Sequence, residues 1–331
     1  MHITKELIEN TYNQISPWLR TTALDYSIEL SEKTGVNVWL KKEYQQFTGS
    51  FKLRGALSCI SQLNQAQKDA GVITASSGNH GLGVAMAGKI TGTNVTVYLP
   101  ENTSIVKLKA LQYLNANVIV VDGDCLLAEQ QAAKQAKEKG CYYVSPYNDP
   151  YVIAGQATLG MEIHQQLPNA DAVFVSVGGG GLISGIGSYY NESQLETEQV
   201  TEKVTKIVGC WPENAQALLK CLEHGEVIEV EEQPTLSEST AGGVEPGSIT
   251  FPIAQKVVDK CYTVSELEIG QAMYALGKYE REIVEGSAGV AMAALMQQAD
   301  QYKGKDVVVV LCGKNIAFDK WLQVIKQHED Q

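Results

Sequence analysis

The chain has 331 residues, of which 44% are hydrophobic and 19% charged, a balance typical of a folded globular protein with about two domains. Its 26 Lys and Arg against 38 Asp and Glu give a net charge of -12. A chain this acidic repels polyanions unless a local basic patch reverses the field, and the sequence has no such patch. We therefore expect no nucleic-acid partner.

The sequence contains no targeting signal, membrane span or metal motif. Residues 1–18 lack the apolar core of a signal peptide, and the purest apolar run, 307–312, is far shorter than the ~20 residues that cross a bilayer. The seven cysteines form no CxxC pair, and the five histidines form no HExxH. We expect a reduced, cytoplasmic protein with no membrane association, no disulfide framework and no metal.

Short β-branched runs alternate along the chain with longer stretches of helical periodicity. Strands are predicted at 36–42, 71–75, 94–99, 117–121, 141–144, 172–177, 204–210 and 306–311. Helices are predicted at 51–66, 80–91, 104–115, 124–139, 151–167, 213–224, 265–281, 287–300 and 315–327. Continuous apolar strands separated by helices are typical of parallel sheets buried on both faces. The predicted fold class is therefore α/β, doubly wound.

Two polar stretches and one turn-rich segment interrupt this alternation. Residues 191–203 are predicted as a surface loop, and the acidic residues 226–238 as an irregular crossing. The segment SPYNDP, 145–150, is rich in turn-forming residues, so a domain boundary is predicted at 146–150.

Open α/β sheets bind ligands where strands end and helices begin, and three segments there carry unusual residues. The first is QFTGSFKLRGA, 46–56, in which Lys52 lies at the start of a helix with an apolar inner face. Lys52 beside Phe51 could simply extend its alkyl chain over apolar surface, which is the common arrangement. Alternatively, it is a desolvated amine with a lowered pKa that can form a Schiff base. Its position alone does not decide between the two.

The second segment is ASSGNHGLG, 75–83, again at a strand-to-helix turn. Polar side chains and free backbone amides at a helix start suit a small carboxylate; the polar residues are Ser76, Ser77, Asn79 and His80. The alternative is ordinary N-capping, because Ser and Asn are favoured N-cap residues.

The third segment is SVGGGGLISG, 176–185, in which four consecutive glycines lead from a predicted strand into a helix. Glycines let backbone amides converge on a phosphate without obstruction by a Cβ. The alternative is a tight turn that needs positive φ, although such a turn rarely requires four glycines. The pattern is neither a dinucleotide fingerprint nor a P-loop, since from Gly179 it reads G-x-G-x-x-S and no GK[ST] occurs in the chain.

With LCGKN at 311–315, the segments SFKLRGA, SSGNHG and GGGGL resemble, in that order, the four landmark motifs of the fold type II pyridoxal-phosphate enzymes, in particular the serine/threonine dehydratase (threonine ammonia-lyase) and serine racemase group. The resemblance runs from about residue 21 to the C-terminal helix. It implies two doubly wound parallel-sheet domains, as in the tryptophan synthase beta fold. A small domain, 46–145, carries SSGNHG and is inserted into a large cofactor-binding domain formed by 1–45 and 146–331.

The resemblance also implies the site residues. Lys52 would form the Schiff base with pyridoxal 5'-phosphate, Phe51 would pack near its ring, and Asn79 would hydrogen-bond its 3'-oxygen. Backbone amides would bind the phosphate at Gly178, Gly179, Gly180, Gly181 and Leu182, and the substrate carboxylate would lie against Ser76, Ser77, Asn79 and His80. Cys312 would face the pyridine nitrogen and leave it largely neutral; a small buried hydrophobe that ends a strand is the alternative reading of this cysteine.

The implied reaction is α,β-elimination of L-threonine or L-serine to a 2-oxo acid and ammonia, with Lys52 removing Cα–H, in a homodimeric enzyme of amino-acid metabolism. A serine racemase with dehydratase side activity is the alternative. Ser77 stands where biosynthetic dehydratases typically carry Ala and where racemases carry the Ser that acts on the face opposite the lysine. A non-catalytic amino-acid or phosphate-binding protein is the third possibility.

Two departures from the group bear on metal and regulation. Racemase-like members bind a divalent cation in the segment that here reads CWPENAQA, and Trp211 and Ala217 replace the acidic ligands. The metal site is therefore expected to be absent, with Glu213 and Glu245 as the residues that leave doubt. The chain ends soon after the catalytic motifs, so we expect no appended regulatory domain and no control by isoleucine.

Overall fold

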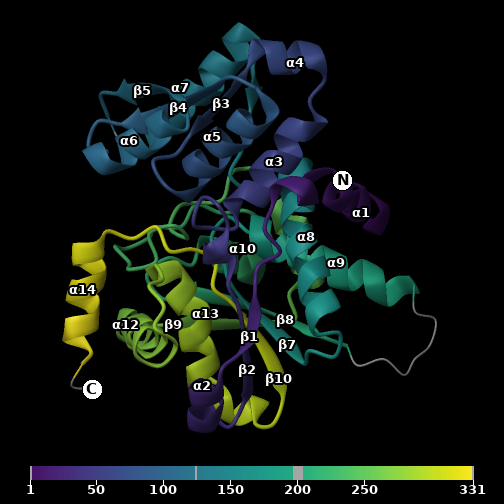
Figure 1. The fold of residues 1–331 in the computed structure, drawn as a ribbon, viewed down its shortest axis with the longest axis vertical. Coiled ribbons are helices and arrows are strands. Elements are labelled where there is room, and N and C mark those ends of the chain that lie inside the picture. Colours follow the sequence, from purple (N-terminus) through teal and green to yellow (C-terminus); the bar gives the residue numbers. More distant parts are fainter. Residues whose placement is uncertain (1, 124, 197–203, 330–331) are drawn as a thin grey trace.

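The computed structural model describes residues 2–123, 125–196 and 204–329, which form two sheets with helices around them (Figure 1). The six-stranded sheet has the order β1-β2-β10-β7-β8-β9. Its strands are β1 (Leu24–Tyr26), β2 (Asn37–Lys41), β10 (Asp306–Val310), β7 (Ala172–Ser176), β8 (Lys206–Pro212) and β9 (Lys260–Val264). All its pairings are parallel except that of β1 with β2.

The smaller sheet is fully parallel and has the order β5-β4-β3-β6. Its strands are β5 (Asn117–Val121), β4 (Val95–Pro100), β3 (Val72–Ala75) and β6 (Tyr142–Tyr143). The chain therefore enters the large sheet, leaves it after β2 to form the whole small sheet, and returns at β7. Figure 1 shows the small sheet above and the large sheet below.

Helices connect and cover the strands in both parts of the chain. The α-helices are α1 (Lys5–Ile15), α2 (Ile28–Thr34), α3 (Lys52–Gln62), α4 (Gln65–Ala70), α5 (Asn79–Thr91), α6 (Ile105–Tyr113), α7 (Cys125–Lys139), α8 (Pro150–Gln166), α9 (Gly181–Glu196), α10 (Ala217–His224), α11 (Thr250–Val257), α12 (Glu266–Ala275), α13 (Gly286–Gln297) and α14 (Phe318–Gln327). Short 3-10 turns lie at Ser16–Trp18, Glu43–Gln45 and Ala299–Tyr302, and a π-helical turn at Leu276–Glu280 follows α12. No helix in the described ranges is long and apolar enough to cross a membrane.

The α/β prediction is confirmed, and every predicted strand is present. The pattern missed β1, β9, α1, α2 and α11. β1 has only three residues, and β9 is an edge strand with exposed residues at its start, so neither leaves a clear apolar run. The helix predicted at 51–66 is broken at Leu63, because Asn64 starts α4 with a capping box in which its side chain accepts from the Gln67 amide.

The two polar stretches behave differently. Residues 226–238 lie outside helices and strands, as predicted. The loop predicted at 191–203 is wrong in its first part, because α9 continues to Glu196; residues 197–203 lie outside the described residues. Polar composition alone therefore did not separate the end of a helix from a loop at this point.

Helices α3 and α8 cross with their backbones in contact. A Cβ on Gly155 of α8 would lie 2.5 Å from the Arg54 carbonyl oxygen and 2.6 Å from the Gly55 Cα, both in α3. These are backbone atoms, which cannot rotate away as a side chain can. The crossing joins two helices that flank the small sheet in sequence: α3 follows β2, and α8 precedes β7.

Replacing Gly155 with alanine is therefore expected to lower the free energy of unfolding by about 1–3 kcal/mol, the usual cost of overpacking. Urea denaturation of the two proteins measures the difference. Gly243→Ala is the matched control, because a Cβ there meets no atom within 4 Å and the backbone is not in the left-handed region. Equal losses in the two variants would show that the crossing has room for a methyl group.

Candidate active site

Lys52 is the first residue of α3 and lies beside the end of β10. The preceding residues lie against the loop that follows β10: Ser50 forms a β-bridge with Gly313, and the Phe51 amide donates to the Cys312 carbonyl at 3.1 Å. The Lys52 amine donates to the Pro146 carbonyl at 2.9 Å, and its Nζ lies 5.2 Å from the centre of the Phe51 ring. Three segments that are far apart in the chain thus meet at one amine.

The environment of Lys52 shifts the protonation of its amine. Burial lowers the pKa of Lys52 to about 8, against weaker opposing effects of Cys312 and Glu285. A lysine with this pKa is largely deprotonated at mildly alkaline pH, whereas an ordinary lysine is not. Burial also raises the pKa of the Cys312 thiol well above its usual value, so Cys312 stays neutral. The environment favours the desolvated amine over the ordinary extended lysine.

Helix α5 begins at Asn79 without a side-chain cap, so the capping alternative for ASSGNHGLG is wrong. Its N-cap residue is Gly78, and no described side chain caps it. The Ser76 hydroxyl instead accepts from the Gly78 amide at 3.2 Å, and Ser77 is half-buried at the same turn. An uncapped helix start with free amides fits an anion such as a carboxylate.

The His80 ring does not supply a positive charge to this turn. Its Nε2 donates to the Val144 carbonyl at 2.9 Å, which places its side chain against the small sheet. Burial and the nearby Lys52 lower the pKa of His80 to about 3, so the ring is neutral. Because Nε2 is used in this bond, the backbone amide of His80 is the group available to bind an anion at the start of α5.

The glycine run at 178–181 lies between β7 and α9. A Cβ on Gly178 would lie 2.7 Å from the Thr240 carbonyl, one on Gly179 would lie 2.5 Å from the Tyr147 ring, and Gly180 has a φ of +87°. A Cβ on Gly181 would lie 3.0 Å from the Tyr147 Cα. Close contacts favour glycine at 178 and 179, and the positive φ favours it at 180, so the run by itself does not distinguish a phosphate cradle from a tight turn.

A buried carboxylate that the sequence reasoning missed lies at the centre of the site. Asn79 Nδ2 donates to both Glu285 oxygens, at 2.9 and 3.0 Å, and the Asn315 amide donates to Oε2 at 3.1 Å. The Ser239 hydroxyl also donates to Oε1. Asn315 Nδ2 in turn donates to Asn79 Oδ1 at 2.6 Å. Burial raises the pKa of Glu285, while the hydrogen bonds from Ser239, Asn79 and Asn315 act in the opposite direction.

The sequence offered a weak signal for this carboxylate. Glu285 is the N-cap residue of α13, whose first residues are small, but its side chain makes no capping hydrogen bond. An acidic residue before a glycine-rich helix start is a weak signal, because acidic residues near helix starts are common. Asn315 was within the quoted motif LCGKN without a role of its own.

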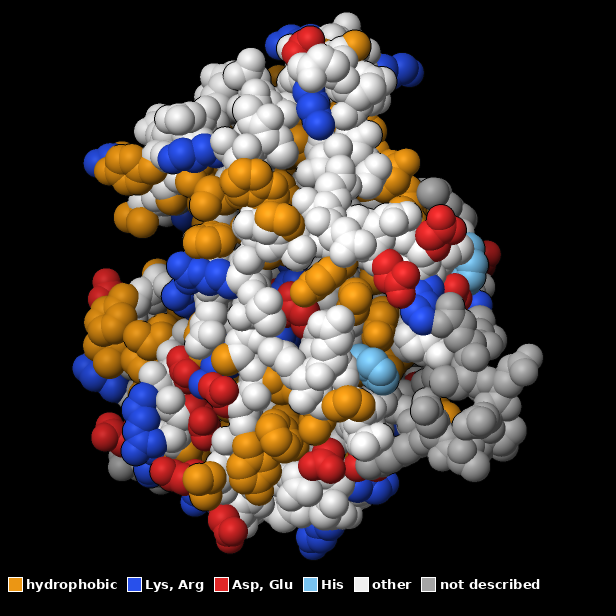
Figure 2. All heavy atoms as spheres, turned by 45° about the vertical axis from the view of Figure 1, so that its right-hand side comes forward, with side chains coloured by type: hydrophobic (Ala, Val, Ile, Leu, Met, Phe, Trp, Pro, Cys, Tyr) orange, Lys and Arg blue, Asp and Glu red, His pale blue; other side chains and the backbone are white. Residues whose placement is uncertain are grey.

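The residues present fit a phosphorylated aldehyde cofactor. The site has a desolvated amine at Lys52, an uncapped helix at Asn79, and buried hydroxyls at Thr48 and Ser50 that have no hydrogen-bond partner in the described part of the chain. In the space-filling view the surface is hollowed between the upper part of the molecule, which carries the small sheet, and the lower part (Figure 2). A bound polar ligand would supply hydrogen-bond partners for the Thr48 and Ser50 hydroxyls.

Residues 15–313 match the model of the pyridoxal-phosphate dependent enzyme family. The chain belongs to this family. Pyridoxal phosphate is therefore its cofactor, and the recognition made from the four motifs is confirmed.

Relatives narrow the group within the family. The chain is 38% identical over 315 residues to an L-threonine ammonia-lyase of Thermotoga maritima, covering 95% of this chain and 76% of that protein. It is 35% identical to a catabolic L-threonine dehydratase of Staphylococcus aureus, covering 96% and 91%. The chain spans about half of the length of some plant relatives, such as 53% of a threonine dehydratase of Nicotiana attenuata.

Solved structures agree with the predicted fold type. Threonine deaminase isoform 2 of Solanum lycopersicum has a TM-score of 0.89 at 30% identity, covering 98% of this chain and 95% of that one. Maize serine racemase has a TM-score of 0.88 at 25% identity, covering 99% and 98%. The fold is thus similar to that of both a deaminase and a racemase.

Proposed function

We propose that this enzyme is a dehydratase, or ammonia-lyase, that converts L-threonine, L-serine or both to a 2-oxo acid and ammonia by α,β-elimination. The observation that carries the proposal is the desolvated Lys52 amine beside the neutral thiol of Cys312, in a chain similar to threonine ammonia-lyases over nearly its whole length.

The residues that would hold pyridoxal phosphate come from four segments of the chain. Lys52 would bind its aldehyde carbon, Phe51 would pack near its ring, Asn79 would donate to its 3'-oxygen, and Cys312 would face its ring nitrogen. Backbone amides would hold its phosphate at Gly178, Gly179, Gly180, Gly181 and Leu182. When bound, the cofactor supplies an electron sink for the electrons of the Cα–H bond.

The protein side chains supply orientation and proton transfer. The amides at the start of α5, from Ser76, Ser77, Asn79 and His80, would hold the substrate carboxylate and so fix which bond at Cα faces Lys52. The Lys52 Nζ would take the Cα proton, for which its lowered pKa suits it. The neutral Cys312 thiol lends no positive charge to the ring nitrogen, which favours prompt loss of the β-hydroxyl over reprotonation of Cα.

A substrate panel tests the assignment. Purified enzyme with pyridoxal phosphate is expected to release a 2-oxo acid from L-threonine or L-serine, measured with a coupled dehydrogenase, and to show a visible absorbance band that borohydride removes. A hydroxyaspartate completes the panel of β-hydroxy amino acids. A protein that carries the band but produces no 2-oxo acid from any of them would contradict the proposal.

Serine racemase remains the second candidate because of Ser77, half-buried at the substrate end of α5, and because of the similarity to maize serine racemase. Racemisation needs an acid on the face opposite Lys52, and Ser77 is the residue that the motif offers for this role. We expect dehydration to dominate, with slow racemisation of serine as a side reaction. Faster formation of D-serine than of pyruvate from L-serine would favour the racemase instead.

Ser77→Ala is expected to remove racemisation and to retain much of the dehydration. The reason is that elimination needs only Lys52 and a leaving group, whereas racemisation also needs the second acid. Competing barriers that differ by ~1.4 kcal/mol change the product ratio tenfold, so chiral chromatography of serine beside a pyruvate assay resolves the change. Equal losses of both products would assign Ser77 a role in binding rather than in proton transfer.

Activity is also expected to survive exhaustive chelation. Trp211 is fully buried, and a Cβ on Gly209 would lie 2.4 Å from its ring, so the indole fills the segment where racemase-like enzymes place an acidic ligand. The residues that the structure describes contain no group of three or more His, Cys, Asp or Glu arranged to hold a metal. Dialysis against EDTA followed by assay is the measurement; loss of activity that Mg²⁺ restores would show a cation site elsewhere.

We also propose the domain division 1–45 with 146–331 and the inserted domain 46–145, a homodimer and a cytoplasmic location. The insertion is supported by the small sheet, whose strands all lie between β2 and β7 in sequence. Sedimentation analysis of the purified enzyme measures its oligomeric state.

A further inference from the structure

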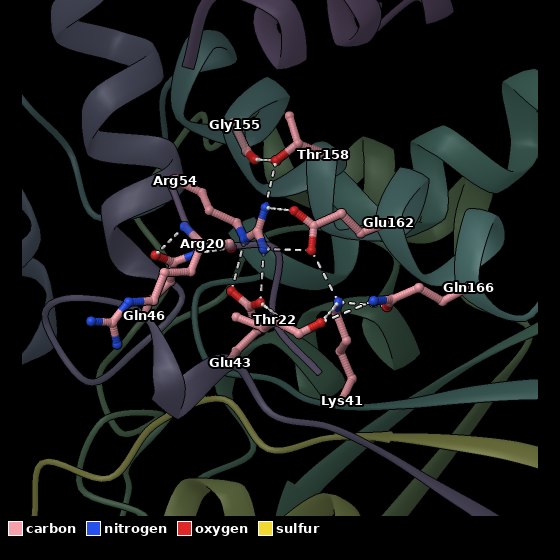
Figure 3. Close-up of polar contacts among 10 residues, drawn as sticks. All are labelled: Arg20, Thr22, Lys41, Glu43, Gln46, Arg54, Gly155, Thr158, Glu162 and Gln166. Carbon is pink, nitrogen blue, oxygen red and sulfur yellow. Dashed lines mark hydrogen bonds and ion pairs between the residues drawn. The ribbon is translucent and has the colours of Figure 1, made fainter. Parts of the chain in front are cut away.

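Four buried charged side chains form a network next to the first turn of α3 (Figure 3). They are Lys41 and Glu43 near the end of β2, Arg54 in α3 and Glu162 in α8, each at most 2% exposed. Two are positive and two negative, so the network is neutral.

Arg54 lies at the centre of this network, and all five of its N–H groups have acceptors. Its Nε and Nη2 donate to Glu43 at 2.7 and 2.9 Å, and its Nη1 and Nη2 donate to Glu162 at 2.7 and 2.9 Å. Nη1 also donates to the Thr158 hydroxyl at 3.3 Å. The guanidinium therefore binds two carboxylates, each by two hydrogen bonds, which fixes its direction as well as its position.

Lys41 occupies the other end of the network, and none of its three hydrogen bonds goes to α3. Its Nζ donates to the Thr22 carbonyl at 2.8 Å, to Glu162 Oε2 at 3.0 Å and to Gln166 Oε1 at 2.8 Å. Its three protons are thus used. Burying charged groups is costly, and apolar residues often replace such networks without loss of stability, so stability is a weak reason for this arrangement.

The network lies on the side of α3 away from Lys52. Two residues along an α-helix differ by about 200° in direction, so Arg54 and Lys52 point to nearly opposite sides. The helix is enclosed by glycine contacts: a Cβ on Gly83 of α5 would lie 3.0 Å from the Lys52 carbonyl carbon, and Gly155 of α8 contacts Gly55. These contacts limit translation of α3. Its apolar face packs into the core of the small domain through Leu53, Leu57 and Ile60. On its other side, the two carboxylates that bind Arg54 add a directional polar contact at the first turn.

We propose that Arg54 is a positioning residue for Lys52: by binding Glu43 and Glu162 it fixes the rotation of α3 and so the direction of the Lys52 amine. This inference rests on the proposed function, in which Lys52 is the reacting lysine. A displacement of about 1 Å in a reacting group can cost about 100-fold in rate, so the orientation of α3 matters for catalysis by Lys52.

Two variants weaken the hold while keeping every charge. Arg54→Lys replaces the fork with three donors on one nitrogen, which cannot bind both carboxylates by two bonds each. Glu43→Asp shortens one of the two carboxylate arms. Lys41→Gln is the matched control, because it alters an equally buried side chain of the same network that makes no bond to α3.

The experiment uses the holoenzyme and three readouts: thermal unfolding, kcat with KM, and the pyridoxal phosphate concentration that gives half-maximal borohydride-fixed label on the Lys52 peptide. Arg54→Lys and Glu43→Asp are expected to lower kcat at least tenfold, with KM for the amino acid within twofold, and to raise the half-labelling concentration at least tenfold. Lys41→Gln is expected to lower the unfolding temperature while changing kcat and half-labelling by less than twofold.

The other outcomes overturn the inference. If all three variants lower the unfolding temperature but leave kcat and labelling unchanged, the network serves stability alone. If all three variants lower kcat and raise the half-labelling concentration equally, the cause is a general loosening of the region. Arg54 then does not act specifically on the orientation of α3. If Arg54→Lys does not fold, Glu43→Asp against Lys41→Gln decides the same question. Wild-type label on a lysine other than Lys52 would instead overturn the proposed role of Lys52, and this inference with it.

Discussion

Lys52→Ala is expected to abolish 2-oxo acid production, with a loss of at least about 1,000-fold, while the protein remains folded. The loss follows from the removal of the amine that donates to the Pro146 carbonyl and whose pKa burial lowers to about 8. The free energy of unfolding should change little or increase, because burying the charged amine destabilises the folded protein. The pKa of Lys52 in the folded protein lies below the ordinary 10.5. This destabilisation is therefore fully present below pH 8 and disappears as the pH rises to 10.5. Coupled assay and thermal unfolding measure the two effects.

Lys107→Ala is the matched control for this variant, because it makes the same lysine-to-alanine change at an exposed position on α6. It is expected to keep wild-type turnover and the visible absorbance band. If Lys52→Ala retains 2-oxo acid production and the band, another lysine binds the cofactor. Mass spectrometry of the borohydride-reduced protein would then identify it.

Glu285→Gln is expected to lower kcat by about 10- to 100-fold. In the wild-type protein the Glu285 carboxylate accepts four hydrogen bonds, two of them from the Asn79 side chain. Glutamine replaces one acceptor oxygen with an amide nitrogen, which cannot accept a hydrogen bond from the surrounding donors. We expect Asn79 to rotate or move as a result, and Asn315 to move with it because its Nδ2 donates to Asn79. Hydrogen bonds to a charged group contribute about 1.5–3 kcal/mol each, which corresponds to the expected loss. Stopped assays of kcat and KM, with a spectroscopic titration of pyridoxal phosphate, measure it.

The control for Glu285→Gln is Glu238→Gln. Glu238 is an exposed glutamate that pairs with Lys320 at the surface, and exposed pairs contribute little. It is expected to leave kcat and cofactor affinity within twofold of the wild type. If Glu285→Gln behaves in the same way, the Glu285–Asn79–Asn315 cluster holds the loops together without affecting the site.

The order of strands and helices followed from the sequence because it depends on local patterns. Uninterrupted runs such as 307–311 and 172–175 are apolar on both faces, which is typical of a covered parallel strand, and the structure places both in the middle of the large sheet. Edge strands and short helices do not need such a pattern. β1 and β9 were missed for this reason.

The segments that carry the chemistry were likewise visible in the sequence. A lysine at a helix start, an uncapped turn with free amides and a glycine run each require particular residue types, and their order along the chain pointed to the family. The roles were less visible. Whether Ser76 caps a helix, or whether Gly179 serves a phosphate or the Tyr147 ring, depends on atoms that are not neighbours in sequence.

The meeting of these segments was decided only by the tertiary structure. Lys52 and Pro146 are 94 residues apart, Asn79 and Glu285 are 206 apart, and Arg54 and Glu162 are 108 apart. Periodicity determines which face of an element is buried, but not which other element covers that face. Sequence alone therefore determined the fold class, the cofactor family and the reacting lysine as a candidate. Tertiary contacts determined that Glu285 joins the site through Asn79, and that Arg54 of α3 binds Glu162 of α8, because only close packing brings such distant groups within hydrogen-bond distance.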